Sequence, residues 1–563
     1  MKTEADKSLF KPIVNLKISL EKSLPEIIIK LFTLDSLKSY RLFFYLLLGI
    51  ISALALIFIS IGIPPINALP TDISILLDSG WRIINGQTPH IDYYSPLGML
   101  TGLTVAFGMK VGTPSASAIA YGNVLLLAIL TPWAWLIARS RLSACNAFLF
   151  SLFISLLLIA PRALGTPIGE TTYAMLYNRQ AFALLSMLLI EIFILPRDIP
   201  TANHKFWSGV STGILLALLF CCKVNYFAVA LICILLHILF FRISLPWLLG
   251  LAGGAICLLA GFYFCFKLNF PAYLADISLA AQSQNKIQKL HNIKGAFIDN
   301  FFWLYLSFVL IFINPLEPQQ SSAKQTVFWW QSKLQAIAVS VVIFGVLICG
   351  TNAQTTDIPL FFVAGLILLE NLRRDFLDRG YSANSFLGLK HLFTILIVTL
   401  FGGTILLQDL GSVAASIASY RKKPALIAQS EQLKSQTLSD LLLMEASADY
   451  PPTINDGLNL LSPYVKQDSR VMALDFANPF SLALELPPPV GDALWWHYHH
   501  TFDERSFPKA EKVFQQANLI IIPKQSDEGS GATKYLQEIY GGYLDRHFQK
   551  QDKSMYWTLW TRQ

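Results

Sequence analysis

The chain has 563 residues, of which 54% are hydrophobic and 14% are charged, with a mean hydropathy of +0.50 and a formal net charge of +7. Soluble domains carry about 25% charged residues, so this composition excludes a soluble enzyme of ordinary surface, a disordered protein and a nucleic-acid binder. Several apolar runs approach the roughly 20 residues that a helix needs to cross a hydrocarbon core. We expect a polytopic α-helical membrane protein surrounded by membrane lipids.

The N-terminal segment 1–41 is polar and holds seven lysines before the first long apolar run. This order does not fit a cleavable signal peptide, so we expect a cytoplasmic segment followed by a retained spanning helix. Apolar length and charged flanks predict about eleven transmembrane helices. They lie at 42–64, 117–138, 145–161, 179–196, 207–222, 224–241, 246–267, 300–314, 330–350, 358–371 and 391–408.

The segment 96–111 is a further apolar candidate, but it is short and contains three glycines. It either spans the membrane or lies flat in the interface. The flat alternative places basic residues such as Arg139 and Arg141 in the cytoplasm, as the positive-inside rule requires. We therefore expect a flat segment within a first extracytoplasmic loop, 65–116, in a transmembrane module of residues 42–408. The loops 161–178 and 268–299 are expected on the same face.

Residues 409–563 differ from the apolar part, because they hold 15 basic and 18 acidic residues and no cysteine. We expect them to form a small extracytoplasmic α/β domain with its own core. Its predicted strands are 470–476, 517–523 and 555–561, and its predicted helices are 422–448, 506–516 and 531–548. All seven cysteines of the chain lie in apolar runs, so neither disulfides nor a metal site nor a cofactor is expected.

The first predicted loop collects ionisable groups beside the membrane, where a lipid with a charged head group would bind. An aspartate there suits a general base toward an acceptor hydroxyl, and an arginine suits a phosphate, which it holds with two hydrogen bonds. The alternative is that these charges cap helices or are solvated. The candidate catalytic residues are Asp72 and Asp78, and the candidate substrate-binding residues are Arg82, His90, Asp92 and Tyr93.

The loop runs from Asp72 through a helix-like stretch to Asn85-Gly86, then to Pro89-His90-Ile91-Asp92-Tyr93 and Pro96-Leu97. This order resembles the first-loop pattern of GT-C fold glycosyltransferases, closest to the protein O-mannosyltransferase and aminoarabinose transferase types of glycosyltransferase family 39. The resemblance implies that a sugar passes, with inversion, from a polyprenyl-phosphate carrier to a lipid, polysaccharide or protein acceptor on the extracytoplasmic face.

In that family an acidic residue of this loop binds or deprotonates the acceptor. Asp72 is the best positional match, because it lies fourteen residues before Gly86, and Asp78 is the second choice. The chain departs from the family pattern at two positions. Ile73 stands where a second acidic residue is usual, and His90 stands where the pattern has tyrosine.

Basic and polar residues at the mouths of later spans are candidates for the donor phosphate. Arg162, Tyr177, Asn178 and Arg179 precede or open one span, and Lys223 stands between two spans with almost no loop around it. We expect Asp72, Arg179 and Lys223 to converge on one cavity. Interfacial anchoring and snorkelling are the alternatives for the same residues.

Three further stretches have a structural explanation beside a functional one. The basic residues Lys286, Lys289, His291 and Lys294 either contact a pyrophosphate or lipid head groups, or form a solvated helix face. Residues 350–354 either bind a sugar or form a turn. The histidines of 495–500 lack the spacing of known zinc motifs, so we expect this aromatic stretch to rest on the membrane or the transmembrane part.

The sequence therefore favours a membrane glycosyltransferase that uses a polyprenyl-phosphate-linked sugar, in a bacterial inner membrane with a periplasmic C-terminal domain. Two alternatives remain. A secondary transporter or flippase of envelope precursors would explain the many spans, although acidic residues within them are scarce. A non-catalytic scaffold of envelope polysaccharide assembly would keep the same topology without a catalytic aspartate.

Overall fold

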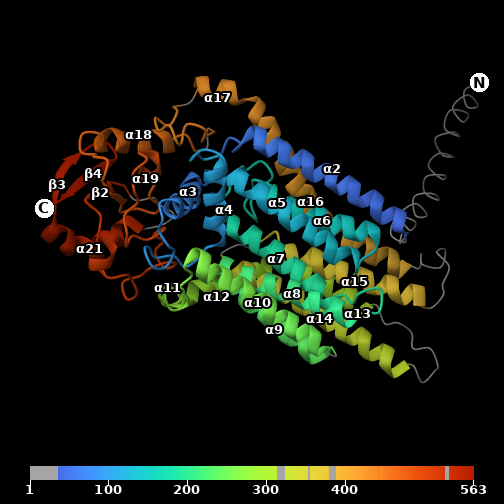
Figure 1. Ribbon diagram of the computed structural model, residues 1–563. Helices are drawn as coiled ribbons and strands as arrows, with labels where there is room; N and C mark the ends of the chain where they lie inside the picture. Colours follow the sequence, from blue (N-terminus) through green and yellow to red (C-terminus); the bar gives the residue numbers. More distant parts are fainter. Residues whose placement is uncertain are drawn as a thin grey trace, which may run out of the picture.

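The computed structural model describes residues 36–563 except 242, 314–323, 353–355, 379–388, 430, 445–446 and 526–531. Most of the predicted cytoplasmic segment, residues 1–35, lies outside this range. Long helices form an elongated bundle, and the C-terminal part of the chain forms a separate body at one end of it (Figure 1). The described chain is thus a helical membrane module with a domain seated on one end.

Each of the eleven predicted spans coincides with a helix. These helices are α2 (Leu37–Ile61), α5 (Ala118–Arg139), α6 (Ala144–Ile159), α7 (Leu176–Phe193), α8 (Ala202–Cys222), α9 (Val224–Phe240), α10 (Leu245–Phe266), α13 (Phe301–Ile313), α14 (Lys324–Thr351), α15 (Pro359–Asp378) and α16 (Leu389–Arg421). Five of them, α2, α5, α7, α8 and α10, are long and apolar enough within the described residues to cross a membrane. That all eleven cross it stays a prediction.

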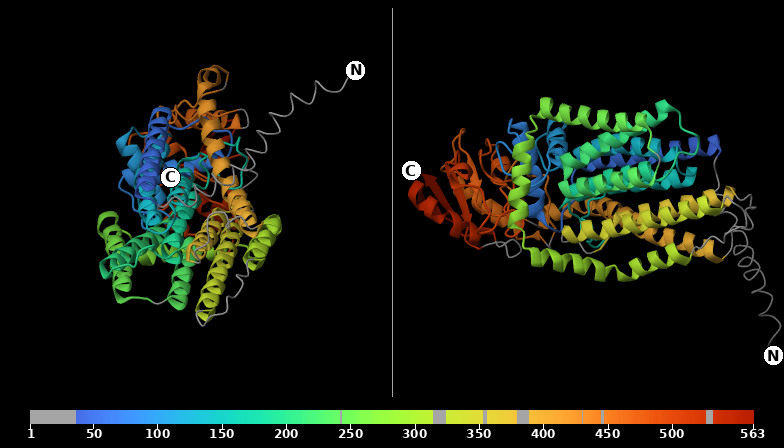
Figure 2. Two further views of the ribbon diagram at one scale, coloured as in Figure 1. Left: turned by 90° about the vertical axis from the view of Figure 1, so that its right-hand side faces the viewer. Right: turned by 90° about the horizontal axis from the view of Figure 1, so that it is seen from below.

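Short helices lie between the bundle and the C-terminal domain. They are α3 (Pro70–Ile84), α4 (Leu100–Val111) and α11 (Phe270–Ser283), whereas α12 (Lys286–Asp299) follows α11 and packs along α14. Helix α4 in Figure 1 and α11 in the right-hand view of Figure 2 run across the long helices. Helix α3 packs against α4, since a Cβ on Gly80 would lie 2.7 Å from the Val105 side chain. Helix α4 of the segment 96–111 thus crosses the end of the bundle. That it lies in the membrane interface stays a prediction.

Glycines bring α8 and α10 into backbone contact. A Cβ on Gly213 would lie 2.1 Å from the carbonyl oxygen of Leu251, and a Cβ on Gly254 would lie 2.4 Å from that of Val210. Gly209 and Gly250 make equally close approaches to the opposite helix. Small residues at such spacing let membrane helices pack backbone against backbone. Close van der Waals contact between the two backbones, rather than interlocking large side chains, therefore holds α8 against α10.

We expect Gly254→Val to destabilise the protein by about 1–3 kcal/mol, because overpacking forces the two backbones apart. Gly253→Val is the matched control, since nothing lies within 4 Å of a Cβ at Gly253. Thermal unfolding of both variants in detergent measures the difference. Equal Tm values for the two variants would contradict the close packing of α8 on α10.

The C-terminal domain begins later than residue 409. Helix α16 continues through this position to Arg421 and is followed by α17 (Lys423–Gln429). The predicted helix 422–448 is therefore wrong beyond Gln429, since Glu431–Met444 form turns and extended chain. The domain also contains α18 (Tyr450–Leu461), α19 (Phe480–Ala483), α20 (Ala510–Val513) and α21 (Ala532–His547).

A four-stranded sheet lies at the centre of the domain, in the order β1-β2-β4-β3. Its strands are β1 (Val471–Ala473), β2 (Leu519–Pro523), β3 (Phe548–Lys553) and β4 (Trp557–Arg562). Strands β1 and β2 are parallel and the other two pairs are antiparallel. Successive residues of a strand point to opposite faces of the sheet, and both faces are buried here. Met472 and Ile520 pack against α21, whereas Val471 and Ile521 face the opposite layer.

That opposite layer includes the first loop of the membrane module. The apolar stripe of α3, formed by Ile73, Leu77 and Trp81, belongs to the same core as strands β1, β2 and β4. Trp81 also donates its indole N–H to the carbonyl of Leu486 at 2.8 Å. The expected independent core is therefore a shared one, because α3 packs against α19 and belongs to the same core as one face of the C-terminal sheet.

Candidate functional site

A polar cluster forms where α7 begins beside the junction of α8 and α9. The half-buried ammonium of Lys223 donates hydrogen bonds to Asn178 Oδ1 at 3.0 Å and to Asn352 Oδ1 at 2.8 Å. It also lies over the ring of Tyr177, 4.6 Å from the ring centre. Tyr177, Asn178 and Lys223 are therefore brought together as the sequence predicted.

Further polar side chains extend the cluster. Asn225 donates to Asn352 Oδ1 at 3.1 Å, and Asn352 donates its own amide to the Tyr226 hydroxyl at 3.1 Å. Residues from α7, α9 and the end of α14 thus meet around one lysine. Amide groups of this kind hydrogen-bond both a phosphate and sugar hydroxyls.

Asp72 lies in the first turn of α3, behind a proline at the first helical position. Its carboxylate is close enough to the Tyr177 hydroxyl to act on it electrostatically, and Lys223 lies over the same ring. The positive end of the helix dipole favours an ionised carboxylate at this position. The half-buried Asp72 and Lys223 therefore both act on Tyr177.

Burial, together with the charge of Lys289 on α12, lowers the pKa of Lys223 to about 7. The two amide oxygens stabilise the ammonium form without neutralising its charge. An anion bound beside Lys223 would raise this pKa again, so the lysine is well placed to hold a phosphate.

The other charged residues of the first loop join it to the C-terminal domain. Arg82 is fully buried between two carboxylates, with Nε 2.6 Å from Asp78 Oδ2 and Nη2 2.9 Å from Asp492 Oδ2. Its Nη1 donates to the carbonyl of Pro489 at 2.9 Å. We call Asp78, Arg82 and Asp492 the junction triad. Protein groups hold the Arg82 guanidinium and one carboxylate oxygen of Asp78, so the triad joins the loop to the C-terminal domain. That Asp78 and Arg82 meet a substrate stays a prediction.

His90, Asp92 and Tyr93 are also engaged by protein groups. His90 Nδ1 lies 3.0 Å from Asp276 Oδ2 on α11, and Asp92 Oδ2 accepts the backbone N–H of Thr88 at 2.6 Å. Tyr93 is buried, with its ring 5.1 Å from the Arg82 guanidinium carbon. These contacts shape the loop and account for the three residues without a ligand.

Arg162 and Arg179 share one carboxylate inside the bundle. Arg179 Nη2 donates to Asp409 Oδ2 at 2.8 Å, and three more of its N–H groups donate to backbone carbonyls. Arg162 is bound by Asp357 at 2.6 Å and by Asp409 at 3.4 Å. The expected convergence of Arg179 with Asp72 and Lys223 is therefore not seen, because its guanidinium is held by protein acceptors.

Sequence reasoning missed the acidic partners of these arginines and of His90. Asp276, Asp409 and Asp492 lie far from the first loop in sequence, and none belongs to a recognisable motif. The only available signal was the burial of basic residues in apolar surroundings, since buried charges are normally paired.

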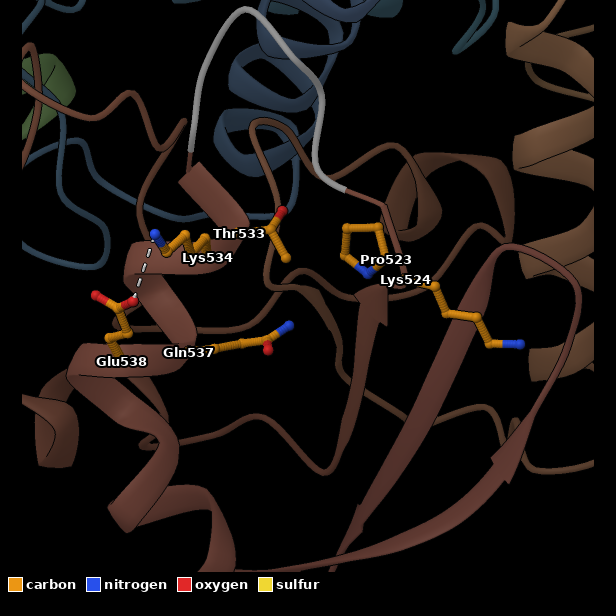
Figure 3. Close-up of a pocket in the computed structure, with 6 residues that line it drawn as sticks. All are labelled: Pro523, Lys524, Thr533, Lys534, Gln537 and Glu538. Atoms are coloured by element: carbon orange, nitrogen blue, oxygen red, sulfur yellow. Dashed lines mark ion pairs between the residues drawn. The ribbon is translucent and has the colours of Figure 1, made fainter.

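The C-terminal domain carries a separate surface cavity of about 380 Å³ beside the carboxyl end of β2 (Figure 3). Its charged groups have partners: Lys534 pairs with Glu538 on α21, and Lys524 extends away from the other residues and donates to the Ser554 carbonyl. Thr533 donates to Asp475 at 3.0 Å. None of the residues that line this cavity belongs to the Lys223 cluster. Within the described residues no group of histidines, cysteines and acids is arranged to bind a metal.

Comparisons with known proteins find no matching family model and no matching curated protein. Two solved structures are similar over 92% of this chain and 97% of theirs, both of ArnT from Cupriavidus metallidurans. The apo structure has a TM-score of 0.45 and 11% identity, and the structure bound to undecaprenyl phosphate has a TM-score of 0.44 and 9% identity. Likeness at this level is weak, so the support for a function comes from the residues of this chain.

Proposed function

We propose that this membrane protein is an inverting glycosyltransferase that moves a sugar from a polyprenyl-phosphate carrier to an acceptor hydroxyl. The observation that carries the proposal is the meeting of Asp72 with the Lys223 cluster at Tyr177. A carboxylate and a cation that both act on one tyrosine, beside apolar helices, suit a substrate with a lipid tail and a phosphate head.

Asp72 is the base in this proposal. It takes the proton of the acceptor hydroxyl while the acceptor oxygen bonds to the anomeric carbon of the sugar. The bond from that carbon to the carrier phosphate breaks, and its electron pair stays on the phosphate oxygen. Attack opposite to the leaving group inverts the anomeric centre.

Lys223 and its asparagines stabilise the leaving phosphate. Negative charge builds up on this group as the bond breaks, and a fixed cation in a partly buried site stabilises it better than water does. The amide of Asn178 and the Tyr177 ring hold the ammonium in place. The scheme uses no metal, and an acidic residue in place of Lys223 would repel the donor.

The acceptor in this proposal is a glycan, lipid or protein on the extracytoplasmic side of a bacterial inner membrane. The shared core between α3 and the C-terminal sheet supports this arrangement, because it holds a folded domain beside Asp72. An acceptor that approaches from outside the membrane would meet this domain before it reaches the carboxylate.

Replacing Lys223 tests the proposal. We expect Lys223→Met to raise the KM for a polyprenyl-phosphate sugar about ten- to hundredfold, because a charged hydrogen bond to the phosphate is lost. The measurement is transfer of radiolabelled sugar by the purified protein in nanodiscs. Lys205→Met, at the other end of α8, is the control and should leave KM unchanged.

An unchanged KM in Lys223→Met would remove this residue from the donor site and contradict the proposal. The same nanodisc preparation separates the transport alternative. Solute flux into proteoliposomes that contain no carrier lipid would assign the chain to transport instead.

A further inference from the structure

Helices α12 and α13 form one continuous rod beside α14. Asn300 stands between them and keeps the helical hydrogen bonds, because its backbone N–H donates to the Ala296 carbonyl at 3.3 Å and its carbonyl accepts the N–H of Leu304 at 2.8 Å. One side of the rod is packed, since a Cβ on Gly350 at the end of α14 would lie 2.6 Å from the Cα of Ile293. The side that carries Ile293 therefore faces the protein.

The opposite side of the rod carries an exposed apolar stripe. Its members are 60–82% exposed, and they are Ile287, Leu290, Ile298, Phe301 and Phe302. At 3.6 residues per turn, these side chains lie within about 120° of one another around the helix axis. Contiguous exposed apolar patches mark contacts with proteins or membranes, and this stripe continues onto a predicted membrane span. Lipid is therefore the expected neighbour of the stripe.

Two basic residues interrupt the stripe. His291 and Lys294 are exposed and lie three residues apart on the same face of α12. Within the described part of the chain, no carboxylate forms an ion pair with either of them. Asp299 is the one acidic residue of α12, and it lies in the last turn, more than one turn beyond Lys294. The stripe therefore combines an apolar surface with a lysine and an imidazole.

These two residues lie at the expected level of the lipid head groups. Gly350 ends the predicted span 330–350, and Ile293 contacts it. Lys294 follows Ile293 in the chain, so its ammonium lies near the expected membrane boundary. A long basic side chain at that level extends to the head groups while its methylene groups stay on apolar surface. Ile298 and Phe301, which follow along the stripe, lie on the acyl-chain side.

We infer that α12 and α13 bind an anionic phospholipid, with its phosphate on Lys294 and His291 and its acyl chains along the stripe. An amphipathic helix gains affinity for such lipids from its apolar area and its basic groups together. The site is distinct from the Lys223 cluster, because Lys294 and His291 lie about 100° and 160° around the helix from Ile293, which faces α14. The bound lipid is neither donor nor acceptor in the proposed sugar transfer.

The test measures which lipids the full-length protein retains after release from nanodiscs made of equal parts of phosphatidylglycerol and phosphatidylcholine. Native mass spectrometry counts the lipids that stay bound. We expect phosphatidylglycerol to be enriched, and Lys294→Gln to lower this enrichment about fivefold, the usual effect of one basic residue at an anionic membrane surface. Adding His291→Ala should lower it further. Lys294→Arg keeps the cation and should stay within about twofold of the unchanged protein.

Three controls locate the effect. Lys534→Gln removes a lysine that is 70% exposed in the C-terminal domain, and it should retain phosphatidylglycerol as the unchanged protein does. Lys223→Met should also retain it, because Lys223 belongs to the donor cluster. Glycerol phosphate carries a phosphate without acyl chains and should not displace the phospholipid.

Equal enrichment in Lys294→Gln and the unchanged protein would overturn the inference. Equal losses in Lys294→Gln and Lys294→Arg would also overturn it, because the charge would then have no role. Loss of phosphatidylglycerol in Lys223→Met would place the lipid in the donor cluster instead. Displacement by glycerol phosphate would indicate a site for free phosphate, and a dimer without bound phospholipid would show that the stripe packs on a second copy of the chain. Either result would remove the phospholipid site.

Discussion

Asp72→Asn is expected to lower the rate of sugar transfer about 10²- to 10⁴-fold, the usual contribution of a general base. The amide keeps the size of the side chain and its place in the first turn of α3, but it does not accept a proton from the acceptor. Expression, membrane insertion and carrier binding should stay unchanged, since Lys223 and its asparagines are intact. The measurement is single-turnover transfer with saturating polyprenyl-phosphate sugar.

Asp92→Asn is the matched control for this prediction. Asp92 lies in the same loop and accepts the Thr88 backbone N–H at 2.6 Å, which an asparagine side chain also does. It should transfer sugar at the full rate. Full activity in Asp72→Asn would remove Asp72 from the chemistry, whereas a partly active Asp72→Glu would support a base whose position matters.

Arg82→Met is expected to destabilise the protein by about 3–5 kcal/mol, because it leaves two buried carboxylates without their cation. Asp78 and Asp492 are both about 1% exposed, so water does not replace the guanidinium. The Pro489 carbonyl also loses its donor. Thermal unfolding in detergent and limited proteolysis of the C-terminal domain should both report the loss.

The pH dependence separates this charge effect from a simple packing defect. Burial raises the pKa of Asp492 to about 6 and also raises the pKa of Asp78. An acid whose pKa is raised by folding loses stability as the pH rises from its unfolded pKa to its folded pKa. Arg82 lowers the pKa of both acids, so its removal raises these values further and extends the loss to higher pH. The loss in Arg82→Met should therefore be larger at pH 7 than at pH 5.

Two controls complete this test. Lys534→Met breaks an exposed ion pair with Glu538 and should cost less than about 1 kcal/mol. A triple variant with leucine at 78 and 492 and methionine at 82 removes every charge and should recover most of the stability. A Tm in Arg82→Met equal to that of the unchanged protein would show that the junction triad contributes nothing to the attachment of the domain.

The sequence predicted local elements well where one chemical pattern decides them. Pro70 at the first helical position and the spacing of Ile73, Leu77 and Trp81 indicate an amphipathic helix, and α3 has this form. The apolar runs predicted the positions of the bundle helices for the same reason. Strands β1, β2 and β4 fall within their predicted ranges or one residue beyond, because each is short and rich in branched or aromatic residues.

Elements without such a pattern were missed. Strand β3 reads FQKQDK and is exposed along five of its six residues, so alternation alone does not reveal it. Helix α18 begins with two prolines after its first residue, which reads as a loop. Both elements depend on partners in space: β3 pairs with β4, and α18 packs on the shared core.

The site was predictable only in part for a related reason. Lys223 and Asp72 are conspicuous because each is a charge beside an apolar run. Their companions are less visible, since Arg82 is paired with a residue 410 positions away and Arg179 with one 230 positions away. A single sequence shows that a charge must have a partner, but it does not show which distant residue provides it.

The shared core of α3 and the C-terminal sheet also sets an order of events during synthesis. The indole N–H of Trp81 donates to the Leu486 carbonyl, and the ribosome adds Leu486 405 residues after Trp81. At ribosomal rates of about 5–20 residues per second, the apolar stripe of α3 stays uncovered for roughly 20–80 s. The first loop therefore completes its folding last, although it is among the first parts of the protein to be made.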